Sequence, residues 1–408
     1  MPHPAFDPNR ILRSTMLETL AINNYRSIKE LVIPLSRLNL ITGANGSGKS
    51  NLYRALRLLA STAQDGIVAP LASEGGLQSV VWAGPEDRSG AMRRGEIPLQ
   101  RPAKGTPAPR LKLGFGGMTF GYAVSMGLAQ ESSESPSAFK LDPEFKREAI
   151  WSGAFLRSSN MLIDRDGNVV HRRSDDGWDT VTHSLPRYES LFSQIGNDRS
   201  SPEVFEVREV MRRWRFYDHF RIDVDAPARR SHVGTRTPVL HHDGRDLAAA
   251  WQTILEVGDH QALDDAVSDA FPGAHVEIET ERDGLFSLVF RQDGLFRPLK
   301  AAELSDGTLR YLLLCAALLT ARPPELMVLN EPEASLHPDL IPALGRLIRQ
   351  AAMYSQIWVV SHSTRLASAL EEDTEFSQIT LEKAFSETTI LGQHKLDRPV
   401  WRWPDSGK

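Results

Sequence analysis

Residues 43–50 constrain the fold of this chain more than any other segment. They read GANGSGKS and match the pattern G-x-x-x-x-G-K-[ST] at every fixed position. An apolar run, residues 38–41, precedes them, and residues 52–59 then carry apolar side chains at the spacing of one helix face. Strand, glycine-rich turn and amphipathic helix are the context of a nucleotide-binding phosphate loop. We therefore predict an α/β fold built around such a loop.

The chemistry of phosphate binding explains these residue types. Glycines let backbone N–H groups wrap around phosphates, and the following helix adds the positive end of its dipole. Lys49 would reach the β- and γ-phosphates, and the Ser50 hydroxyl would ligate Mg²⁺. The predicted cofactors are thus ATP and Mg²⁺, and the predicted loop residues are Gly43, Asn45, Gly46, Ser47, Gly48, Lys49, Ser50 and Asn51. The alternative is a glycine-rich turn with a chance Lys-Ser pair.

A phosphate loop needs a carboxylate partner at the end of another strand. Residues 326–329 are apolar and lead directly into Asn330-Glu331-Pro332-Glu333, the layout of a Walker B motif. The first position is usually Asp, whereas Asn330 can hydrogen-bond a metal-bound water but brings no charge. Glu331 is placed to act as general base on the attacking water. The alternative is a strand that ends in a solvated acidic turn.

Two further segments complete the predicted set. Residues 303–308 read ELSDGT and precede a helical pattern, so the Ser305 hydroxyl, the Gly307 amide and the helix N-terminus predict a second anion site. By itself this segment would also serve as an ordinary helix cap. His362 follows the apolar run of the next strand, where it could hydrogen-bond the γ-phosphate or orient the water. A structural or solvated histidine is the alternative.

The order of these four motifs resembles that of ABC-type ATPase heads. NNYRSIKELVIPL followed by LNLITGANGSGKSN resembles the RecF/SMC branch, and LNEPEASLHPDLIPALGRLI is similar to predicted RecF-like ATPases with an AAA-type core. The resemblance covers residues 17–60 and 235–395. It implies an ABC-type ATPase head with an antiparallel β-subdomain and a mixed helical and β lever insert.

The resemblance also implies roles for single residues. Ser305 and Gly307 would form a signature loop that acts in trans on ATP held by the partner of a homodimer. Residues 334–337 would be the D-loop at the dimer seam. The catalytic residues would be Lys49, Glu331 and the switch histidine His362, Asn330 would hold Mg²⁺ through water, Arg26 would lie near the nucleotide, and Gln130 would be a Q-loop residue. Asn330 and Asp306 depart from the family pattern.

The four segments lie far apart, which indicates a head that is split in sequence. We predict an N-terminal lobe over residues 1–60, a β-subdomain and lever insert over 61–240, a C-terminal lobe over 241–395 and a tail over 396–408. Strands are expected at 17–25, 30–35 and 356–361, with two antiparallel strands within 111–129 and a β-meander at 276–299. Helices are expected at 203–216, 246–257, 261–271 and 340–351, and Pro338 lies in the first turn of the last one. The insert lacks the heptads of a long-armed SMC protein, and residues 363–408 are too few for a Toprim nuclease domain.

Composition narrows the class of protein. The formal net charge is −5, so the chain is not a bulk polyanion binder, although residues 86–112 and 205–236 are locally basic. A solvated helix face with internal ion pairs is the alternative for the second segment. The single cysteine excludes a disulfide framework, and no apolar run could span a bilayer, so a cytoplasmic protein is expected. The adjacent His241 and His242 would make a poor metal chelate.

Together the motifs predict a slow ATPase that dimerises on ATP and acts on DNA in repair, chromosome maintenance or defence. Because Asn330 lacks a charge, an ATP-gated sensor or scaffold that controls a separate effector protein is the main alternative. An ABC transporter ATPase subunit is less favoured, since the N-terminal segment is RecF-like and no membrane segment is present.

Overall fold

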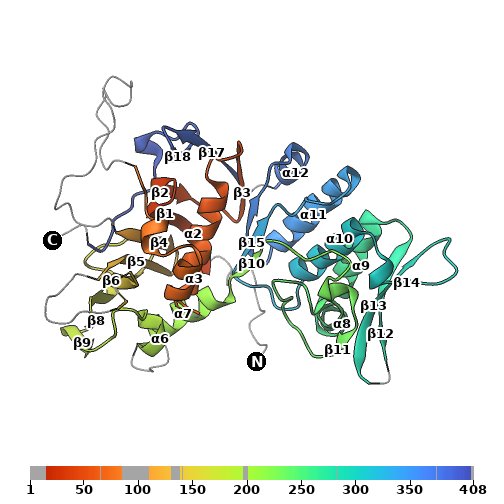
Figure 1. The fold of residues 1–408 in the computed structure, drawn as a ribbon, viewed down its shortest axis with the longest axis horizontal. Coiled ribbons are helices and arrows are strands. Elements are labelled where there is room, and N and C mark those ends of the chain that lie inside the picture. The colour runs from red at the N-terminus through yellow and green to blue at the C-terminus, as the bar shows by residue number, and fades with distance from the viewer. Residues whose placement is uncertain are drawn as a thin grey trace, which may run out of the picture. The chain divides into compact units, whose positions relative to one another are not determined.

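The computed structural model describes residues 15–64, 66–84, 110–129, 138–139, 141–195, 201–281, 283–373 and 375–405 (Figure 1). Within these ranges the chain forms two compact units. Unit 1 contains residues 36–41 and 215–378, and unit 2 contains residues 15–35, 42–214 and 379–405. The chain passes from unit 1 into unit 2 inside one strand, β3 (Leu38–Gly43).

Unit 2 is built on an antiparallel sheet of eight strands in the order β2-β1-β4-β5-β6-β7-β8-β9. The strands are β1 (Leu17–Tyr25), β2 (Ile28–Pro34), β4 (Leu111–Gly117), β5 (Phe120–Leu128), β6 (Pro143–Ser152), β7 (Met161–Asp166), β8 (Val169–Ser174) and β9 (Gly177–Thr182). Ile22 lies opposite Leu31 on one side and Leu113 on the other, and all three are buried. This confirms the strands predicted at 17–25, 30–35 and 111–129.

The helices of unit 2 include α2, which follows the phosphate loop. They are α2 (Lys49–Ser61), α3 (Val68–Ser73), α4 (Leu77–Val80), α6 (Leu191–Gln194) and α7 (Pro202–Arg213). The C-terminal strands are β17 (Phe376–Ala384), whose last six residues belong to unit 2, and β18 (Glu387–Ile390), which pairs antiparallel with it. Leu52, Leu56 and Leu59 of α2 are buried, as the helical spacing predicted.

A buried ion pair lies in the β-layer of unit 2. Glu148 on β6 and Arg165 on β7 have fully buried side chains and form a salt bridge. Glu148 also accepts hydrogen bonds from the Tyr122 hydroxyl (2.7 Å), the Ser190 hydroxyl (2.8 Å) and the Leu191 N–H (3.0 Å). Because each of these partners stabilises the carboxylate, the buried charge is compensated. The network fastens residues 190 and 191 to the sheet.

Unit 1 contains a run of parallel strands in the order β10-β15-β16-β3, of which β3 contributes its first four residues. Besides β3 they are β10 (Arg215–Tyr217), β15 (Leu326–Asn330) and β16 (Gln356–Val360). Every residue of β16 is buried, which is typical of a parallel strand covered on both faces. The buried strands predicted at 38–41, 326–329 and 356–361 are confirmed, the last one ending at Val360.

Helices cover these strands, and a small antiparallel sheet completes unit 1 (Figure 1). The helices are α8 (Leu247–Val257), α9 (His260–Ala270), α10 (Asp306–Leu318), α11 (Ile341–Ala352) and α12 (Thr364–Leu370), and the sheet contains β11 (His232–Val233), β12 (Ala274–Thr280), β13 (Leu285–Gln292) and β14 (Leu299–Lys300). Every residue from Leu309 to Leu318 is buried, so α10 is the central helix of this core. Cys315 lies in it, and burial raises the pKa of its thiol.

Two predicted element boundaries are wrong. The helix expected at 203–216 ends at Arg213, since Trp214 has an extended backbone and β10 (Arg215–Tyr217) pairs with β15. Pairing with a buried parallel strand therefore overrides the helical pattern at this point. Pro338, expected in the first turn of the following helix, instead begins a 3₁₀ turn, η4 (Pro338–Leu340), and α11 begins at Ile341. No helix in the described ranges has the length and apolar character to cross a membrane.

Candidate functional site

The phosphate loop of unit 2 has the backbone that its glycines were predicted to provide. Gly43, Gly46 and Gly48 have φ angles of 141°, 79° and 111°, a region that residues with a Cβ rarely adopt. A Cβ on Gly43 would lie 2.3 Å from the Leu381 carbonyl oxygen, and one on Gly48 would lie 2.1 Å from the Thr388 hydroxyl oxygen. Glycine is thus required at positions 43 and 48 for two reasons: a Cβ would clash with neighbouring atoms, and the φ angle is positive.

The side chains of the loop divide into a buried and an exposed group. Lys49 is 6% exposed and donates hydrogen bonds to the carbonyls of Gly43 (2.7 Å) and Ala44 (3.1 Å), so its ammonium group lies across the loop. Ala44, Asn45 and Gly46 at the tip and Ser50 at the start of α2 are exposed.

A clamp of hydroxyl groups holds the loop from the side of β18. Thr388 donates to the Ser47 carbonyl (2.8 Å), and its hydroxyl lies 2.7 Å from the Ser27 hydroxyl. The Asn51 amide donates to the same Ser27 hydroxyl (2.8 Å). Residues from β18, the β1–β2 turn and α2 are therefore joined around the loop. Asn51 is predicted to bind nucleotide, and in the structure its amide nitrogen bonds Ser27 as part of this clamp.

Arg26 lies next to Ser27 in the same turn, and its φ is 50°. Its guanidinium binds Glu74 at 2.6 Å and 3.2 Å, and the Tyr25 hydroxyl donates to the same carboxylate. Burial works against the charge of Arg26, but its bonds with Glu74 and Tyr25 hold the pKa of the guanidinium above its ordinary value. The structure thus places Arg26 in the unit that carries the phosphate loop, with Glu74 as its partner.

The loop fits the phosphates of a nucleotide. The hydroxyl of Ser47 is buried and has no hydrogen-bond partner among the described residues, which leaves one polar atom of the loop unsatisfied. The space beside Gly43 and Gly48 is too tight for side chains, and α2 begins at Lys49, so the positive end of its dipole lies at the loop. The exposed Ser50 hydroxyl is the hard oxygen donor that Mg²⁺ prefers.

In unit 1 the parallel strands bring three chain positions into one row. Asn330 at the end of β15 is paired with Val360 on β16, and Val360 is paired with Ile41 on β3. The carboxyl ends of these strands therefore lie side by side, and Gly43 follows Ile41 by two positions along the chain. In open α/β sheets, ligands bind outside this edge.

Glu331 and His362 follow two of these strand ends. Glu331 has a φ of 47°, and its N–H donates to the Val360 carbonyl (2.8 Å). One of its carboxylate oxygens lies 3.4 Å from His362 Nε2. Both side chains are substantially exposed, at 50% and 40%. The structure thus brings the predicted base and the predicted switch histidine together.

Buried Arg310 and half-buried Glu333 hold this acidic turn in place. Arg310 on α10 donates to the carbonyls of Glu331 (2.7 Å) and Pro332 (3.2 Å). Burial lowers the pKa of the Arg310 guanidinium, while Glu333 and Glu331 oppose that shift. Glu333 accepts hydrogen bonds from the Ser361 hydroxyl and from the His362 N–H (3.3 Å). The side chains of Arg310 and Glu333 therefore fix the backbone of the turn and that of His362.

The predicted signature loop lies at the start of α10 in unit 1. The Ser305 hydroxyl accepts the Thr308 N–H (3.1 Å) and so caps the helix, while the residue itself is exposed. A Cβ on Gly307 would lie 2.9 Å from the Ser335 carbonyl oxygen. The predicted signature loop is thus packed against the predicted D-loop, residues 334–337. Arg229 ties Asp306 into place with a 2.7 Å ion pair.

The remaining predicted features are the basic segments, Gln130 and the adjacent histidines. In the basic segment 205–236, five arginines form ion pairs with carboxylates within their own unit: Arg212, Arg221, Arg229, Arg230 and Arg236. Gln130 and most of residues 86–112 lie outside the described residues. His241 bonds Asp243 at 2.7 Å in a turn before α8, with the His242 ring beside it.

Three contributors to the site were not singled out from the sequence. Arg310 is the one cation of α10 and lies within its apolar stretch, which is a usable signal for a buried polar contact. Glu333 belongs to the acidic motif itself, yet spacing does not show that it bonds Ser361. Thr388 lies in a tail strand without any motif, and its contact with Ser47 spans 341 positions of the sequence.

The structure is similar to several solved SMC head domains. An Smc head bound to the C-winged helix domain of ScpA matches with a TM-score of 0.50 and 13% identity, over 92% of this chain and 97% of that chain. The SMC head domain from Thermotoga maritima matches with a TM-score of 0.44 and 14% identity, over 93% and 99%. An Smc head with an extended coiled coil from Pyrococcus furiosus matches with a TM-score of 0.47 and 14% identity, over 92% and 95%. No curated protein matches the sequence.

The first of these likenesses confirms the predicted fold, an α/β ABC-type P-loop ATPase head with an antiparallel sheet. A family model matches residues 38–368, a span that includes the phosphate loop, the acidic turn and His362. It covers well over half of the chain, and the chain therefore belongs to the ATPase family described as "AAA domain, putative AbiEii toxin, Type IV TA system".

Proposed function

We propose that this chain is a RecF-like ATPase that binds ATP with Mg²⁺ on the phosphate loop and hydrolyses it slowly. The observation that carries the proposal is the loop geometry: three glycines with positive φ, a buried lysine across the loop and an unsatisfied Ser47 hydroxyl. Lys49 and the N–H groups at the start of α2 would hold the β- and γ-phosphates. Ser50 would bind Mg²⁺ directly, and Asn330 would bind it through water.

The hydrolytic step is assigned to Glu331 and His362. When MgATP is bound, ATP supplies the phosphoryl group, and Mg²⁺ would offset the negative charge on the departing ADP. Glu331 would orient and deprotonate the attacking water, and His362, at 3.4 Å from its carboxylate, would hold the γ-phosphate. The register of Asn330, Val360 and Ile41 supports this assignment, because the phosphate loop begins just beyond Ile41. Asn330 brings no charge, so we propose slow turnover.

We further propose that ATP joins two heads into a homodimer. Ser305 is exposed at the N-terminus of α10, and Gly307 is in contact with residues 334–337. A second copy could therefore present Ser305 and Gly307 to a bound γ-phosphate. Light scattering of the Glu331→Gln variant with and without ATP tests this step: a doubled mass with ATP supports it, and a monomer under both conditions contradicts it.

Action on DNA, in repair, chromosome maintenance or defence, is the cellular role that the RecF-like resemblance favours. The test is ATPase activity without DNA, with single-stranded DNA and with duplex DNA, for the wild type and for Lys49→Ala. We expect DNA to stimulate the wild type and Lys49→Ala to be inactive throughout. Absence of both stimulation and ATP-dependent DNA binding would sink the DNA role while leaving the ATPase assignment in place.

One observation favours a second function. The uncharged Asn330 suits an ATP-gated sensor or scaffold that controls a separate effector protein in the cytoplasm. The solved Smc head is bound to a domain of another protein, ScpA, which provides a precedent for such a partner. Purification of the Glu331→Gln variant with ATP distinguishes the two. A stoichiometric protein that is released on ATP removal supports the sensor, whereas DNA stimulation without such a protein supports the first function.

A further inference from the structure

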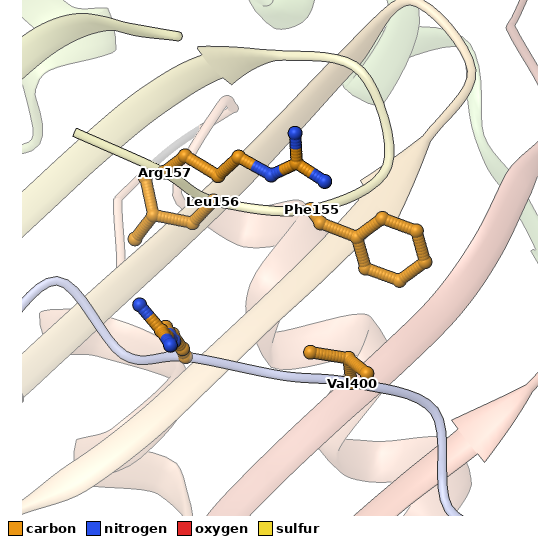
Figure 2. A pocket seen from close by; sticks show the side chains of 5 residues that line it. Phe155, Leu156, Arg157 and Val400 are labelled. Atoms are coloured by element: carbon orange, nitrogen blue, oxygen red, sulfur yellow. The ribbon is translucent and has the colours of Figure 1, made fainter. Parts of the chain in front are cut away.

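A pocket in unit 2 lies apart from the phosphate loop. It has a volume of about 390 Å³, at the lower end of the range for small-molecule sites. Its lining residues are Phe155, Leu156, Arg157, Val400 and Arg402. Figure 2 shows that Phe155, Leu156 and Arg157 project from one loop, while Val400 projects from the C-terminal segment that passes opposite. The pocket thus combines apolar walls with two cations and has no acidic lining residue.

The guanidinium groups of the two arginines in this pocket make no polar contact with the described residues. Arg157 and Arg402 are exposed, and within the described ranges neither guanidinium has an ion pair or a hydrogen bond. This contrasts with the arginines of segment 205–236, most of which bind carboxylates. Guanidinium groups bind phosphates through paired N–H donors. Two unpaired guanidiniums beside apolar surface therefore favour an anionic ligand with flat apolar groups.

Both walls of the pocket are built rigidly. Asn160 fastens the first loop, because its amide donates to the carbonyls of Ser152 (2.7 Å) and Phe155 (2.8 Å) and its oxygen accepts the Arg157 N–H (2.7 Å). The second wall is held by tryptophans: the Trp401 ring lies 5.7 Å from that of Trp151 on β6 and 5.4 Å from that of Trp403.

The C-terminal wall is also anchored by charge and by close packing. Asp405 binds Lys112 at 2.8 Å, and a Cβ on Gly114 would lie 2.7 Å from the Trp401 ring. Lys112 and Gly114 are both on β4, so the segment lies directly on the sheet. A pocket that is held open in this way pays little ordering entropy when it binds a ligand.

A second arginine–aromatic pair continues from the pocket along the same surface. Arg173 on β8 donates to the carbonyl of Ser158 (3.2 Å), the residue after Arg157. Its guanidinium lies 5.6 Å from the centre of the Trp178 ring, on the edge strand β9. Phe155 and Trp178 are each 43% exposed. This part of unit 2 thus carries two exposed aromatic rings, Phe155 and Trp178, and an arginine stacked on one of them.

We infer that this surface, residues 155–157, 173, 178 and 402, binds single-stranded nucleic acid, with phosphates on the arginines and bases on the rings. Sequence-independent binders of single strands combine these two features. The pocket's side chains offer no hydrogen-bond acceptor, which disfavours an extended peptide, whose N–H groups would stay unpaired. The inference rests on the proposed action on DNA, which it deepens by naming a surface outside the phosphate loop.

The test measures fluorescence anisotropy of labelled oligothymidylate and oligouridylate of about 15 nucleotides, over a salt series and without ATP. We expect Arg157→Gln/Arg402→Gln to weaken binding about tenfold or more and to reduce the salt slope by about 1.4, the loss of two phosphate contacts. Phe155→Ala should weaken binding about fivefold or more with the slope unchanged, since it removes stacking only. The oligothymidylate should bind at least as tightly as the oligouridylate, and clearly tighter binding of the oligouridylate would contradict the DNA role on which the inference rests.

A matched control removes two charges elsewhere in unit 2. Arg187, which bonds Asn168, and the exposed Lys383 on β17 are changed together to Gln. If this control weakens strand binding as much, the effect depends on net charge alone and the inference is overturned. It would also be overturned if neither strand binds the wild type at low salt, or if an acidic peptide displaces the dye-labelled strand and a competing strand does not. Lys49→Ala should bind the strand normally, so loss of turnover and loss of strand binding are separable.

Discussion

The phosphate loop and the acidic turn are both predicted contributors to one reaction, yet they are built in opposite ways. The loop's function lies in its backbone: positive φ angles, close contacts and carbonyls bound by Lys49. The acidic turn instead presents two exposed side chains, Glu331 and His362, whose backbone is held by buried Arg310 and half-buried Glu333. Substitutions should therefore affect binding in the first region and turnover in the second.

The largest effect is expected in the loop backbone. Gly48→Ala would place a methyl group 2.1 Å from the Thr388 hydroxyl oxygen and keep φ at 111°. We expect loss of ATP binding and a fall of about 2 kcal/mol in the free energy of unfolding. Isothermal titration and urea unfolding measure these quantities.

Gly66→Ala is the control for Gly48→Ala. Gly66 also has positive φ, at 83°, but a Cβ there meets nothing within 4 Å. The control should lose some stability from strain and keep ATP affinity. If both variants bind ATP alike, the close contact with Thr388 does not shape the loop.

The next effect is expected below the acidic turn. Arg310→Met removes the donor to the Glu331 and Pro332 carbonyls and leaves them buried. We expect a loss of about 3 kcal/mol in unfolding free energy and turnover slower by about tenfold or more, with ATP affinity little changed. Arg346→Met, which breaks an exposed pair with Asp269, should cost about 1 kcal/mol or less. Weakened ATP binding in Arg310→Met would contradict the contrast between the two regions.

A smaller effect tests the hydroxyl clamp. Thr388→Val removes the bond to the Ser47 carbonyl and the contact with Ser27, at a cost of about 1–2 kcal/mol and with weaker ATP binding. Its neighbour Thr389 has a buried hydroxyl without a partner among the described residues, so Thr389→Val should be neutral or stabilising. Equal losses in the two variants would show that the clamp contributes nothing specific.

The smallest effect concerns Glu303, which precedes the predicted signature loop. Hydrogen bonds from Arg297 and from the Lys300 N–H lower the pKa of exposed Glu303 to about 2, against about 4.3 in unfolded chains. Because the folded-state pKa is the lower one, this stabilisation is present above about pH 4.3 and is lost as pH falls toward 2. The difference in unfolding free energy between wild type and Glu303→Gln should shrink over that range. A difference independent of pH would contradict the assigned ion pair.

The contrast also explains how much could be predicted. Local patterns predicted the loop, its glycines and α2, since each depends on neighbours in sequence. They also predicted β15 and β16, because buried parallel strands are continuous apolar runs. Contacts between distant segments left no pattern: Thr388 reaches Ser47, and Arg310 reaches Glu331. The helix end near Trp214 was missed because strand pairing with β15 overrides the helical spacing.

The most direct test of the account compares Lys49→Ala with Glu331→Gln in two assays, equilibrium ATP binding and single-turnover hydrolysis. The account predicts that Lys49→Ala loses binding by about a hundredfold or more, because its ammonium group lies across the loop. Glu331→Gln should bind ATP as tightly as the wild type and hydrolyse it slower by about a hundredfold or more. Hydrolysis by Glu331→Gln at the wild-type rate would contradict the account.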